Sequence, residues 1–394
     1  MATPAPAPRS YRVAIVAGEA SGDALGAALM QALRTRVPGV EFAGIGGPRM
    51  RAAGCVCWHD AAELAVMGLI EVLPHLPRLL RIRRELVARV LAERPDVYVG
   101  VDFKEFNLSV ERRLKARGVR TVQYVSPQAW AWREGRARTI GEACDEMLCL
   151  LPFEPAFYAR FGVQARFVGH PLADEIPIDG PPDDPGHAQR AAARAALGLA
   201  ATGPVVALLP GSRAGEVGRL GATFVAAARL LAARHPGLQF IAPMATPEAA
   251  RLFRADGAEP AGIRLLDGQA RLALQAADAS LVASGTASLE SLLCGCPMVV
   301  AYRLGALTAF LLRRLRLVKL AHFSLPNLLA GEALVPEFFQ EAATPAALAA
   351  AVEAQLAPGP ARERQLARFR EIHASLRQDG AARAAEAIAA LVAR

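Results

Sequence analysis

The chain has 394 residues, of which 53% are hydrophobic and 21% are charged. At about 100 to 200 residues per domain, this length predicts two or three domains, and the apolar content excludes a disordered chain. Its 45 basic and 37 acidic residues give a net charge of +8, which favours an anionic partner: a phosphorylated ligand, an acidic membrane surface or nucleic acid.

The first half of the chain alternates predicted strands with predicted helices. Residues 1–10 are rich in Pro and Ala and are predicted to be a disordered tail. Strands are expected at residues 13–17, 42–45, 97–101, 121–125, 147–151 and 166–168. Helices are expected at residues 24–36, 79–94 and 108–117. This alternation predicts parallel βαβ units, whose ligands bind at the carboxyl ends of the strands.

A linker rich in Pro, Gly and Asp is predicted over residues 176–189, and the alternation restarts after it. The next strands are expected at residues 205–209, 239–243, 263–266, 279–282 and 298–302, with a helix over 220–234. Residues 360–394 form a predicted helical segment. The sequence therefore predicts an α/β protein with two doubly wound, Rossmann-like lobes, residues 11–175 and 190–359, facing a central cleft.

Two loops of the second lobe are candidate phosphate sites. In the loop at 210–213, backbone N–H groups and the guanidinium of Arg213 could hold a diphosphate. The loop at 284–286 opens a predicted helix and offers further donors, and Glu290 one turn later could accept ribose hydroxyl groups. Read singly, these features are also compatible with an ordinary turn and an ordinary capped helix. The two loops together favour a nucleoside diphosphate as the ligand. The residues expected to donate hydrogen bonds to its phosphates, besides Arg213, are Gly211, Ser212, Ser284, Gly285 and Thr286.

In the first lobe, Asp102 ends a strand and is a candidate general base, although such an Asp also commonly caps the next helix. Trp130 and Trp132 follow a strand and could stack on a sugar or pack in the core. His170 is more typical of a structural histidine. The glycines at 18, 22 and 26 do not have the spacing of a dinucleotide fingerprint.

Cofactor and membrane signals are limited. The six cysteines lack the spacing of a zinc site and are expected to be reduced thiols. No run of about 20 apolar residues predicts a spanning helix, so a cytoplasmic protein is expected. Residues 69–89 and 303–319 combine leucines with arginines and could lie on an anionic membrane surface. The alternative is a core helix with a solvated cationic face.

An ordered series of motifs from about Tyr11 to Phe339 closely resembles the bacterial lipid-A-disaccharide synthase family. The motifs are Gly-Glu-Ala-Ser-Gly-Asp at 18–23, Gly-Pro-Arg-Met at 47–50, Glu-Leu-Ala-Val-Met-Gly at 63–68, Tyr-Val-Ser-Pro-Gln-Ala-Trp-Ala-Trp-Arg at 124–133, Leu-Pro-Phe-Glu at 151–154, Leu-Leu-Pro-Gly-Ser-Arg at 208–213, Ser-Gly-Thr-Ala-Ser-Leu-Glu at 284–290 and Ser-Leu-Pro-Asn-Leu-Leu-Ala-Gly at 324–331.

The resemblance implies a GT-B glycosyltransferase that needs no metal and no cofactor. Its C-terminal helical segment would pack back on the N-terminal lobe. The enzyme would transfer 2,3-diacylglucosamine, with inversion, from UDP-2,3-diacylglucosamine to 2,3-diacylglucosamine 1-phosphate in lipid A biosynthesis. The products would be a β-1,6-linked disaccharide 1-phosphate and UDP. The family acts at the inner face of the bacterial inner membrane, so the N-terminal lobe would hold the acceptor and face that membrane.

Carried over by position, the resemblance makes Asp102 the base and places Arg213 at the diphosphate. Residues of the other matching motifs are expected to bind substrate: Glu19, Ser21, Trp132 and Asn327. One departure is visible at 103–107, Phe-Lys-Glu-Phe-Asn, where many family members have Ala-Pro-Asp-Phe-Asn. Glu105 replaces the second aspartate, which puts a role for that carboxylate in doubt.

Three other readings stay open from the sequence alone. Another GT-B transferase or a UDP-sugar epimerase would have a similar nucleotide lobe. A membrane-associated module could bind UDP without catalysis. A nucleic-acid binder is disfavoured, because the basic residues lie among aliphatic residues. The oligomeric state is also left open, with a homodimer as one option.

Overall fold

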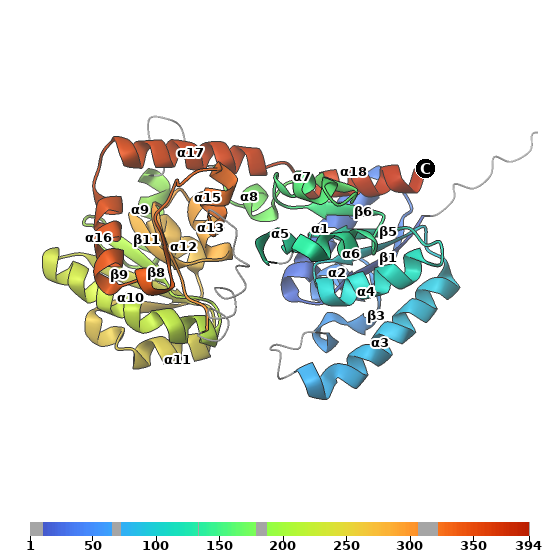
Figure 1. Ribbon diagram of the computed structural model, residues 1–394, viewed down its shortest axis with the longest axis horizontal. Coiled ribbons are helices and arrows are strands. Elements are labelled where there is room, and N and C mark those ends of the chain that lie inside the picture. Colours follow the sequence, from blue (N-terminus) through green and yellow to red (C-terminus); the bar gives the residue numbers. More distant parts are fainter. Residues whose placement is uncertain (1–10, 65–71, 133, 179–186, 306–321, 394) are drawn as a thin grey trace, which may run out of the picture. The chain divides into compact units, whose positions relative to one another are not determined.

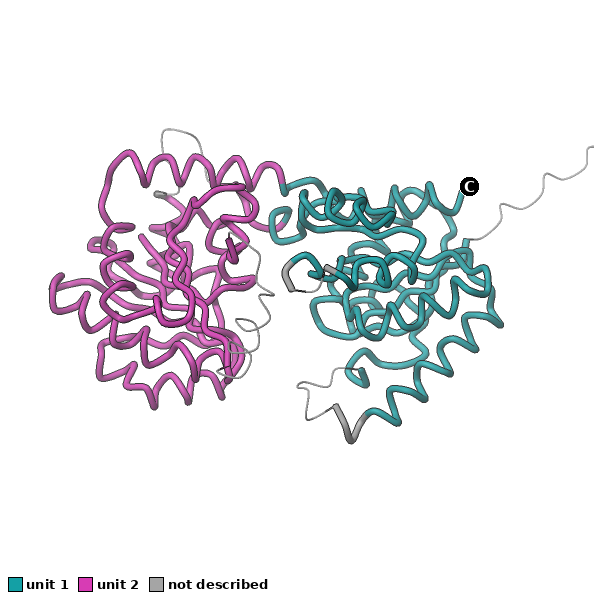
Figure 2. The backbone as a smooth tube through the Cα atoms, in the orientation of Figure 1, with its two compact units in different colours: residues 1–174, 376–394 teal, residues 175–375 magenta. Residues whose placement is uncertain are grey.

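The computed structural model describes residues 11–64, 72–132, 134–178, 187–305 and 322–393. The chain forms two compact units, shown in different colours in Figure 2. Unit 1 comprises Met1–Asp174 and Leu376–Arg394, and unit 2 comprises Glu175–Ser375. Each unit contains its own parallel sheet with helices on both faces (Figure 1).

The sheet of unit 1 has seven strands in the order β3-β2-β1-β4-β5-β6-β7, and every neighbouring pair is parallel. The inner strands are nearly continuous apolar runs, as expected for strands covered on both faces. The strands are β1 (Arg12–Ala17), β2 (Glu41–Gly46), β3 (Val56–Asp60), β4 (Val97–Val101), β5 (Thr121–Tyr124), β6 (Glu146–Cys149) and β7 (Ala165–Phe167).

The helices of unit 1 connect successive strands and cover the sheet. They are α1 (Ala20–Arg36), α2 (Pro48–Ala52), α3 (Val72–Glu93), α4 (Lys104–Lys115), α5 (Ala129–Trp132), α6 (Ala137–Gly141), α7 (Glu154–Ala159) and α8 (Pro171–Glu175), with 3₁₀ turns at Ala61–Glu63 and Glu134–Arg136. Helix α1 begins four residues earlier than its apolar pattern predicts. Its first turn therefore directly follows the loop after β1.

The last helix of the chain, α18 (Gly380–Ala393), belongs to unit 1 and packs beside α1 (Figure 1). Ala384, Ala385, Ala387 and Ile388 of α18 join the core formed by β1, β4 and α1. The carboxylate of Asp174 accepts hydrogen bonds from the backbone N–H groups of Asp379 (3.0 Å) and Gly380 (2.7 Å), which satisfies donors at the start of α18. At its other end, Arg120 donates to the carbonyl of Val392 (2.9 Å).

The sheet of unit 2 has six strands in the order β10-β9-β8-β11-β12-β13, again with all pairs parallel. The strands are β8 (Val205–Leu209), β9 (Gln239–Met244), β10 (Ile263–Asp267), β11 (Ala279–Ala283), β12 (Met298–Tyr302) and β13 (Glu337–Phe339). The two central strands, β8 and β11, are buried along their whole length.

The helices of unit 2 are α9 (His187–Ala196), α10 (Ala214–Arg234), α11 (Pro247–Ala255), α12 (Ala270–Ala276), α13 (Thr286–Leu293), α15 (Leu325–Ala330), α16 (Pro345–Leu356) and α17 (Pro360–Leu376), with 3₁₀ turns at Glu259–Ala261 and Gln340–Ala342. Helix α10 starts six residues before its predicted start, so its N-terminus immediately follows the loop at 210–213. Both sheets therefore follow the doubly wound plan that the sequence predicts.

None of the helices in the described parts of the chain combines the length and the apolar character that a membrane-spanning helix requires. The two stretches expected at a membrane surface fall partly outside the described residues. Residues 65–71 and 306–321 are not described, whereas α3 carries the arginines of the first stretch.

Candidate active site

The predicted site loops lie at the point in each sheet where the strand order reverses. In unit 2, the loops after β8 and β11 are neighbours because these two strands pair directly. In unit 1, the loops after β1 and β4 are neighbours for the same reason. Doubly wound sheets form their ligand sites at this switch point, outside the carboxyl ends of the strands. The topology thus brings Arg213 near Ser284 in one unit, and Gly18 near Asp102 in the other.

The loop after β8 presents an exposed arginine at a helix start. Arg213 immediately precedes α10 and is exposed. Gly211 has φ +138°, and a side chain there would place its Cβ 2.3 Å from the Cβ of Glu216. The carboxylate of Glu216 accepts hydrogen bonds from the backbone N–H groups of Ser212 (3.0 Å) and Arg213 (3.3 Å).

Glu216 changes what the loop at 210–213 can do. The sequence predicts free N–H donors for a diphosphate at Ser212 and Arg213, but the structure places this carboxylate on them. The group left for an anion is the exposed guanidinium of Arg213. The signal was present in the sequence, because an acidic residue three positions after a helix N-cap is typical of a capping box.

The loop after β11 leads to an uncapped helix start. Gly285 occupies the N-cap position of α13 with φ +155° and supplies no side-chain cap. Thr286 begins the helix and is exposed. Ser284 is more constrained: its N–H donates to the carbonyl of Ala301 (3.0 Å) and its hydroxyl to that of Phe323 (3.3 Å). The positive end of α13 is therefore suited to an anion, through the backbone of Gly285 and Thr286.

Glu290 and Asn327, two further residues expected to bind substrate, have different surroundings in the structure. Burial raises the pKa of Glu290, and Arg271, 3.9 Å from its Oε1, acts in the opposite direction. Asn327 is buried, and its amide group donates to the carbonyl of Val335 (3.0 Å) and accepts from the N–H of Val335 (2.8 Å). The side chain of Asn327 thus fixes the backbone after α15, and its predicted substrate contact stays a prediction.

Asp102 directly follows β4 in a backbone conformation that disfavours side chains. Its φ is +51°, and that of Phe103 is +39°. Left-handed non-glycine residues cost about 1 to 3 kcal/mol each and persist only where the surroundings hold them. Here the N–H of Asp102 donates to the carbonyl of Tyr124 (2.8 Å), and its own carbonyl accepts from Asn107 (3.0 Å) and Gln123 (3.1 Å).

The Asp102 carboxyl group is half-buried, and burial raises its pKa. Glu105 raises the pKa further, whereas Lys104 and the N–H of Phe103 lower it. A carboxylate with a raised pKa is a stronger base than an ordinary aspartate. The strained, tightly held backbone and the raised pKa together suit Asp102 to proton abstraction.

The loop at 18–23 contains exposed residues and one buried carboxylate. Glu19 is the N-cap of α1 and Ser21 lies in its first turn, and both are exposed. Asp23 is buried and accepts hydrogen bonds from the N–H groups of Gly47 (2.8 Å), Arg49 (2.9 Å) and Met50 (3.0 Å). Asp23 therefore anchors the start of α2, a role that sequence reasoning missed because its partners lie more than 20 residues away.

The tryptophan motif is tied to another buried carboxylate. Glu154 accepts hydrogen bonds from Ser126 Oγ (2.6 Å), Trp130 Nε1 (3.0 Å) and the N–H of Leu151 (3.0 Å). The ring of Trp130 also packs edge-on against Phe153. Trp130 is thus a structural residue. Trp132 ends α5, and its side chain lies outside the described residues.

His170 lies between β7 and α8 and is held as a neutral imidazole. Its Nδ1 accepts a hydrogen bond from the backbone N–H of Leu172 (3.2 Å), and the backbone N–H of His170 donates to the carbonyl of Leu376 (2.9 Å). Burial lowers the pKa of His170 to about 4. The unfolded chain therefore binds a proton at this residue more readily than the folded chain does.

We expect the stability contribution of His170 to be complete above pH 6.5 and to disappear as the pH falls toward 4. The unfolding free energy should fall by about 1 to 2 kcal/mol more in the wild type than in His170→Asn between pH 7 and pH 5. The Asn variant is the matched control, because its side-chain oxygen can replace Nδ1 as an acceptor without titrating. Urea unfolding at both pH values measures the difference. Parallel pH dependence in the two proteins would contradict this role.

Among the described residues, no three His, Cys, Asp or Glu side chains are grouped as metal ligands. Each unit has its own candidate groups: the Asp102 carboxylate in unit 1, and the Arg213 guanidinium with the N-terminus of α13 in unit 2. Chemically, the first can take a proton and the second can hold a diphosphate.

The model of the family described as lipid-A-disaccharide synthetase matches residues 13–392. The chain belongs to the lipid-A-disaccharide synthase family. It is 54% identical over 387 residues to the lipid-A-disaccharide synthase of Pseudomonas aeruginosa (strain UCBPP-PA14), covering 97% of this chain and 98% of that protein. It is 51% identical over 389 residues to the lipid-A-disaccharide synthase of Xanthomonas campestris pv. campestris (strain 8004), covering 98% of this chain and 87% of that protein.

Similar solved structures include MurG of Acinetobacter baumannii, with a TM-score of 0.58 at 11% identity, covering 97% of this chain and all of that one. A putative UDP-N-acetylglucosamine 2-epimerase of Listeria monocytogenes has a TM-score of 0.63 at 12% identity, and the match covers 98% of this chain and 96% of that chain. At such identities the likeness shows the fold alone, which is GT-B.

Membership of the lipid-A-disaccharide synthase family decides between the readings that the sequence leaves open. The fold is shared by transferases and epimerases, so the fold does not separate them. The family does: the chain is a UDP-sugar glycosyltransferase of lipid A biosynthesis, whose substrates are a sugar nucleotide and a lipid A precursor.

Proposed function

We propose that this chain transfers 2,3-diacylglucosamine from UDP-2,3-diacylglucosamine to 2,3-diacylglucosamine 1-phosphate. The products are a β-1,6-linked disaccharide 1-phosphate and UDP. Family membership supports the substrates, and one structural observation supports the chemistry: Asp102, with a raised pKa, is held in a strained conformation at the switch point of the sheet in unit 1.

In this mechanism, Asp102 takes the proton from the 6-hydroxyl group of the acceptor as its oxygen attacks the anomeric carbon of the donor. The bond between that carbon and the diphosphate oxygen breaks on the opposite side, and the electron pair leaves with UDP. A single displacement of this kind inverts the anomeric centre. The backbone hydrogen bonds of Asp102 hold its carboxylate in place, so little reorganisation accompanies the proton transfer.

The proposal assigns the donor nucleotide to unit 2. Its diphosphate would contact the exposed guanidinium of Arg213 and the N-terminus of α13 at Gly285 and Thr286, which together stabilise the negative charge that develops on the leaving group. Glu290 lies one turn into α13, where its carboxylate could accept the ribose hydroxyl groups. The exposed residues Glu19 and Ser21 would contact the acceptor in unit 1.

Replacing Arg213 by Ala is expected to weaken UDP binding by a factor of about 10 to 100, because a charge-assisted hydrogen bond to phosphate is lost. Arg229→Ala is the matched control. It removes an exposed guanidinium from the same helix, several turns from the loop, and should leave the UDP dissociation constant within a factor of about two. Calorimetric titration with UDP measures both. Equal affinities for the two variants would rule out this assignment of Arg213.

The proposed reaction is tested by UDP release from UDP-2,3-diacylglucosamine in detergent micelles containing EDTA. We expect release only when 2,3-diacylglucosamine 1-phosphate is present, together with a disaccharide product. Release without acceptor would indicate hydrolysis or another acceptor. Binding of UDP without any release would support a nucleotide-binding module in place of the transferase.

We also propose that the enzyme acts at the cytoplasmic surface of the inner membrane, because both substrates carry acyl chains. The basic residues of α3 support this placement: Arg78, Arg81, Arg84 and Arg89 lie among leucines and are all exposed. Flotation with vesicles containing an anionic lipid tests the proposal, and binding should weaken when the salt concentration rises. Light scattering of the protein without vesicles would establish whether the chain is a homodimer.

A further inference from the structure

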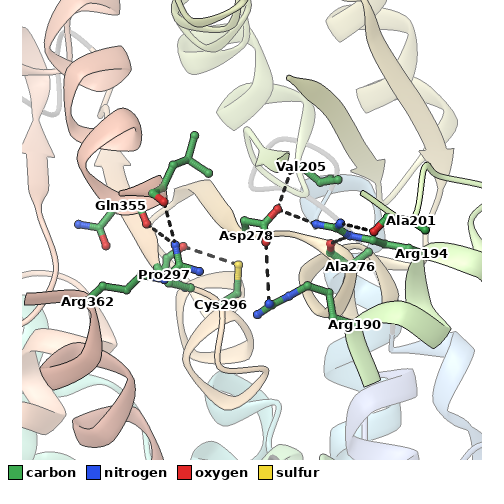
Figure 3. Close-up of polar contacts among 11 residues, drawn as sticks. Arg190, Arg194, Ala201, Val205, Ala276, Asp278, Cys296, Pro297, Gln355 and Arg362 are labelled. Carbon is green, nitrogen blue, oxygen red and sulfur yellow. Dashed lines mark hydrogen bonds and ion pairs between the residues drawn. The ribbon is translucent and has the colours of Figure 1, made fainter. Parts of the chain in front are cut away.

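Figure 3 shows a cluster of arginines in unit 2. The cluster lies at the edge of the sheet opposite the loops at 210–213 and 284–286. Arg190 and Arg194 come from α9, and Arg362 comes from the first turn of α17. Asp278 and Cys296 lie in the segments that precede β11 and β12. Because these strands run parallel, their amino ends lie at one edge of the sheet and the loop at 284–286 lies at the other.

Arg194 and Asp278 form a complete pair within this cluster. Arg194 Nη2 lies 2.6 Å from Asp278 Oδ2, and its other nitrogens donate to the carbonyls of Ala276 and Ala201, both at 3.0 Å. The same carboxylate oxygen also accepts the N–H of Val205 (2.8 Å). This pair ties α9 to the starts of β8 and β11, and the negative charge of Asp278 is already used.

The guanidinium of Arg190 has fewer polar partners than that of Arg194. Among the described residues, the ion pair of Arg190 is with Asp278 Oδ1 at 3.9 Å, which is beyond hydrogen-bond distance. Its Nε is buried and finds no hydrogen-bond partner in the part of the chain that the structure describes. A buried donor without a partner is unfavourable, so the surroundings of Arg190 satisfy its guanidinium incompletely.

The guanidinium of Arg362 also has N–H groups that are not used in hydrogen bonds to the described residues. Within the described residues, its hydrogen bonds come from Nη1, to the carbonyls of Gln355 (2.6 Å) and Leu356 (3.5 Å). Figure 3 shows the side chains of Arg190 and Arg362 on either side of Cys296. Burial lowers the pKa of Arg362, and the positive charge of Arg190 lowers it further. Arg362 also lines a cavity of about 870 Å³ in unit 2.

The charges of the cluster do not balance. Among the described residues drawn in Figure 3, three guanidinium groups accompany one carboxylate, an excess of two positive charges. The Cys296 thiol lies near Arg190 and Arg362 but supplies no charge, because burial raises its pKa to about 11. An excess of this size, combined with unused planar donors, matches the charge and the acceptor geometry of a phosphate dianion.

We infer that Arg190 and Arg362 form a binding site for a phosphate dianion, either inorganic phosphate or the terminal phosphate of a monoester. The side chain of Arg190 is 20% exposed, so a small anion can reach it from solvent. The bound dianion would accept hydrogen bonds from the exposed part of the Arg190 guanidinium and from the unused nitrogens of Arg362. The inference does not rest on the proposed function, because none of these residues belongs to the nucleotide loops.

Calorimetric titration of the full chain with inorganic phosphate at constant ionic strength tests this site. We expect saturable binding that Arg190→Gln and Arg362→Gln each weaken at least tenfold. Arg364→Gln is the matched control: it removes an exposed arginine of the same helix that lines the same cavity, and it should leave the affinity within a factor of two. Absence of saturable binding, or equal affinity in all four proteins, would overturn the inference.

Two further variants separate this site from alternatives. Arg213→Ala should keep the phosphate affinity, and loss of binding in that variant alone would place the ion at the nucleotide loop and overturn the inference. If Arg190→Gln does not fold, Arg190→Lys keeps the charge but removes the planar fork and should still weaken phosphate binding. Equal binding by the Lys variant would count against a guanidinium site.

The source of the phosphate is decided by two probes of the same wild-type protein. Glycerol 3-phosphate competing with inorganic phosphate would assign the site to soluble phosphomonoesters. Binding to phosphatidate vesicles that depends on Arg190 and Arg362, without competition by glycerol 3-phosphate, would assign it to a lipid headgroup. Either result supports a phosphate site.

Discussion

Replacing Asp102 by Asn is expected to lower kcat by a factor of about 1,000 or more, because general-base catalysis supplies a factor of about 10² to 10⁴ and the amide cannot accept the proton. The variant has nearly the same shape as the wild type, so the backbone hydrogen bonds that hold residue 102 should persist. UDP affinity should stay unchanged, since the nucleotide is assigned to the other unit.

Glu105→Gln is the matched control for Asp102. Glu105 lies in the first turn of α4, three residues along the chain, and stands where many relatives have aspartate. Removing its charge should change kcat by less than about threefold, mainly through the smaller electrostatic effect on the pKa of Asp102. Turnover of Asp102→Asn within tenfold of the wild type would remove Asp102 from the role of base. A large loss in Glu105→Gln would transfer the role to that residue.

The raised pKa of Asp102 also predicts a pH profile. The base must be deprotonated, so kcat/KM should fall as the pH drops through the pKa of the free enzyme. The midpoint of this acid limb should lie above the ordinary aspartate value of about 4. In Glu105→Gln, which removes a carboxylate that raises the pKa, the midpoint should move down. A midpoint at or below the ordinary value would contradict the burial of this carboxyl group.

Replacing Asp23 by Ala is expected to lower the free energy of unfolding by about 3 kcal/mol, because the N–H groups of Gly47, Arg49 and Met50 lose their acceptor in a buried place. Urea unfolding followed by circular dichroism measures this loss. Ser21→Ala, an exposed change in the same motif, should stay within about 0.5 kcal/mol.

The Asp23 experiment decides how the motif at 18–23 is divided between structure and function. We expect the folded fraction of Asp23→Ala to bind UDP as the wild type does. If the variant is as stable as the wild type but inactive, Asp23 belongs to the catalytic machinery instead, and the hydrogen bonds to the start of α2 contribute little to stability.

Much of the fold could be predicted because its signals are local. The buried run Val205–Leu209 and the loop after it are adjacent in the chain, and the alternation of strands and helices is a repeated short-range pattern. The strand β3 was missed, since Trp58, His59 and Asp60 do not form an apolar run and only its pairing with β2 makes it a strand. The edge strand β13, of three residues, was missed for the same reason.

The sequence by itself determined the doubly wound lobes, the family and the polar loops that follow the strands, because periodicity and motif order lie within short segments. Only the tertiary structure decided which polar groups those loops leave free. Glu216 accepts the hydrogen bonds of the N–H groups of Ser212 and Arg213. The side chain of Asn327 is hydrogen-bonded to the backbone of Val335, and Asp23 is hydrogen-bonded to the start of α2. Arg190 and Arg362, more than 170 positions apart in the chain, belong to one cluster of side chains (Figure 3). Such pairings depend on how strands and helices are brought together in space, and the spacing of residues along the chain carries no record of them.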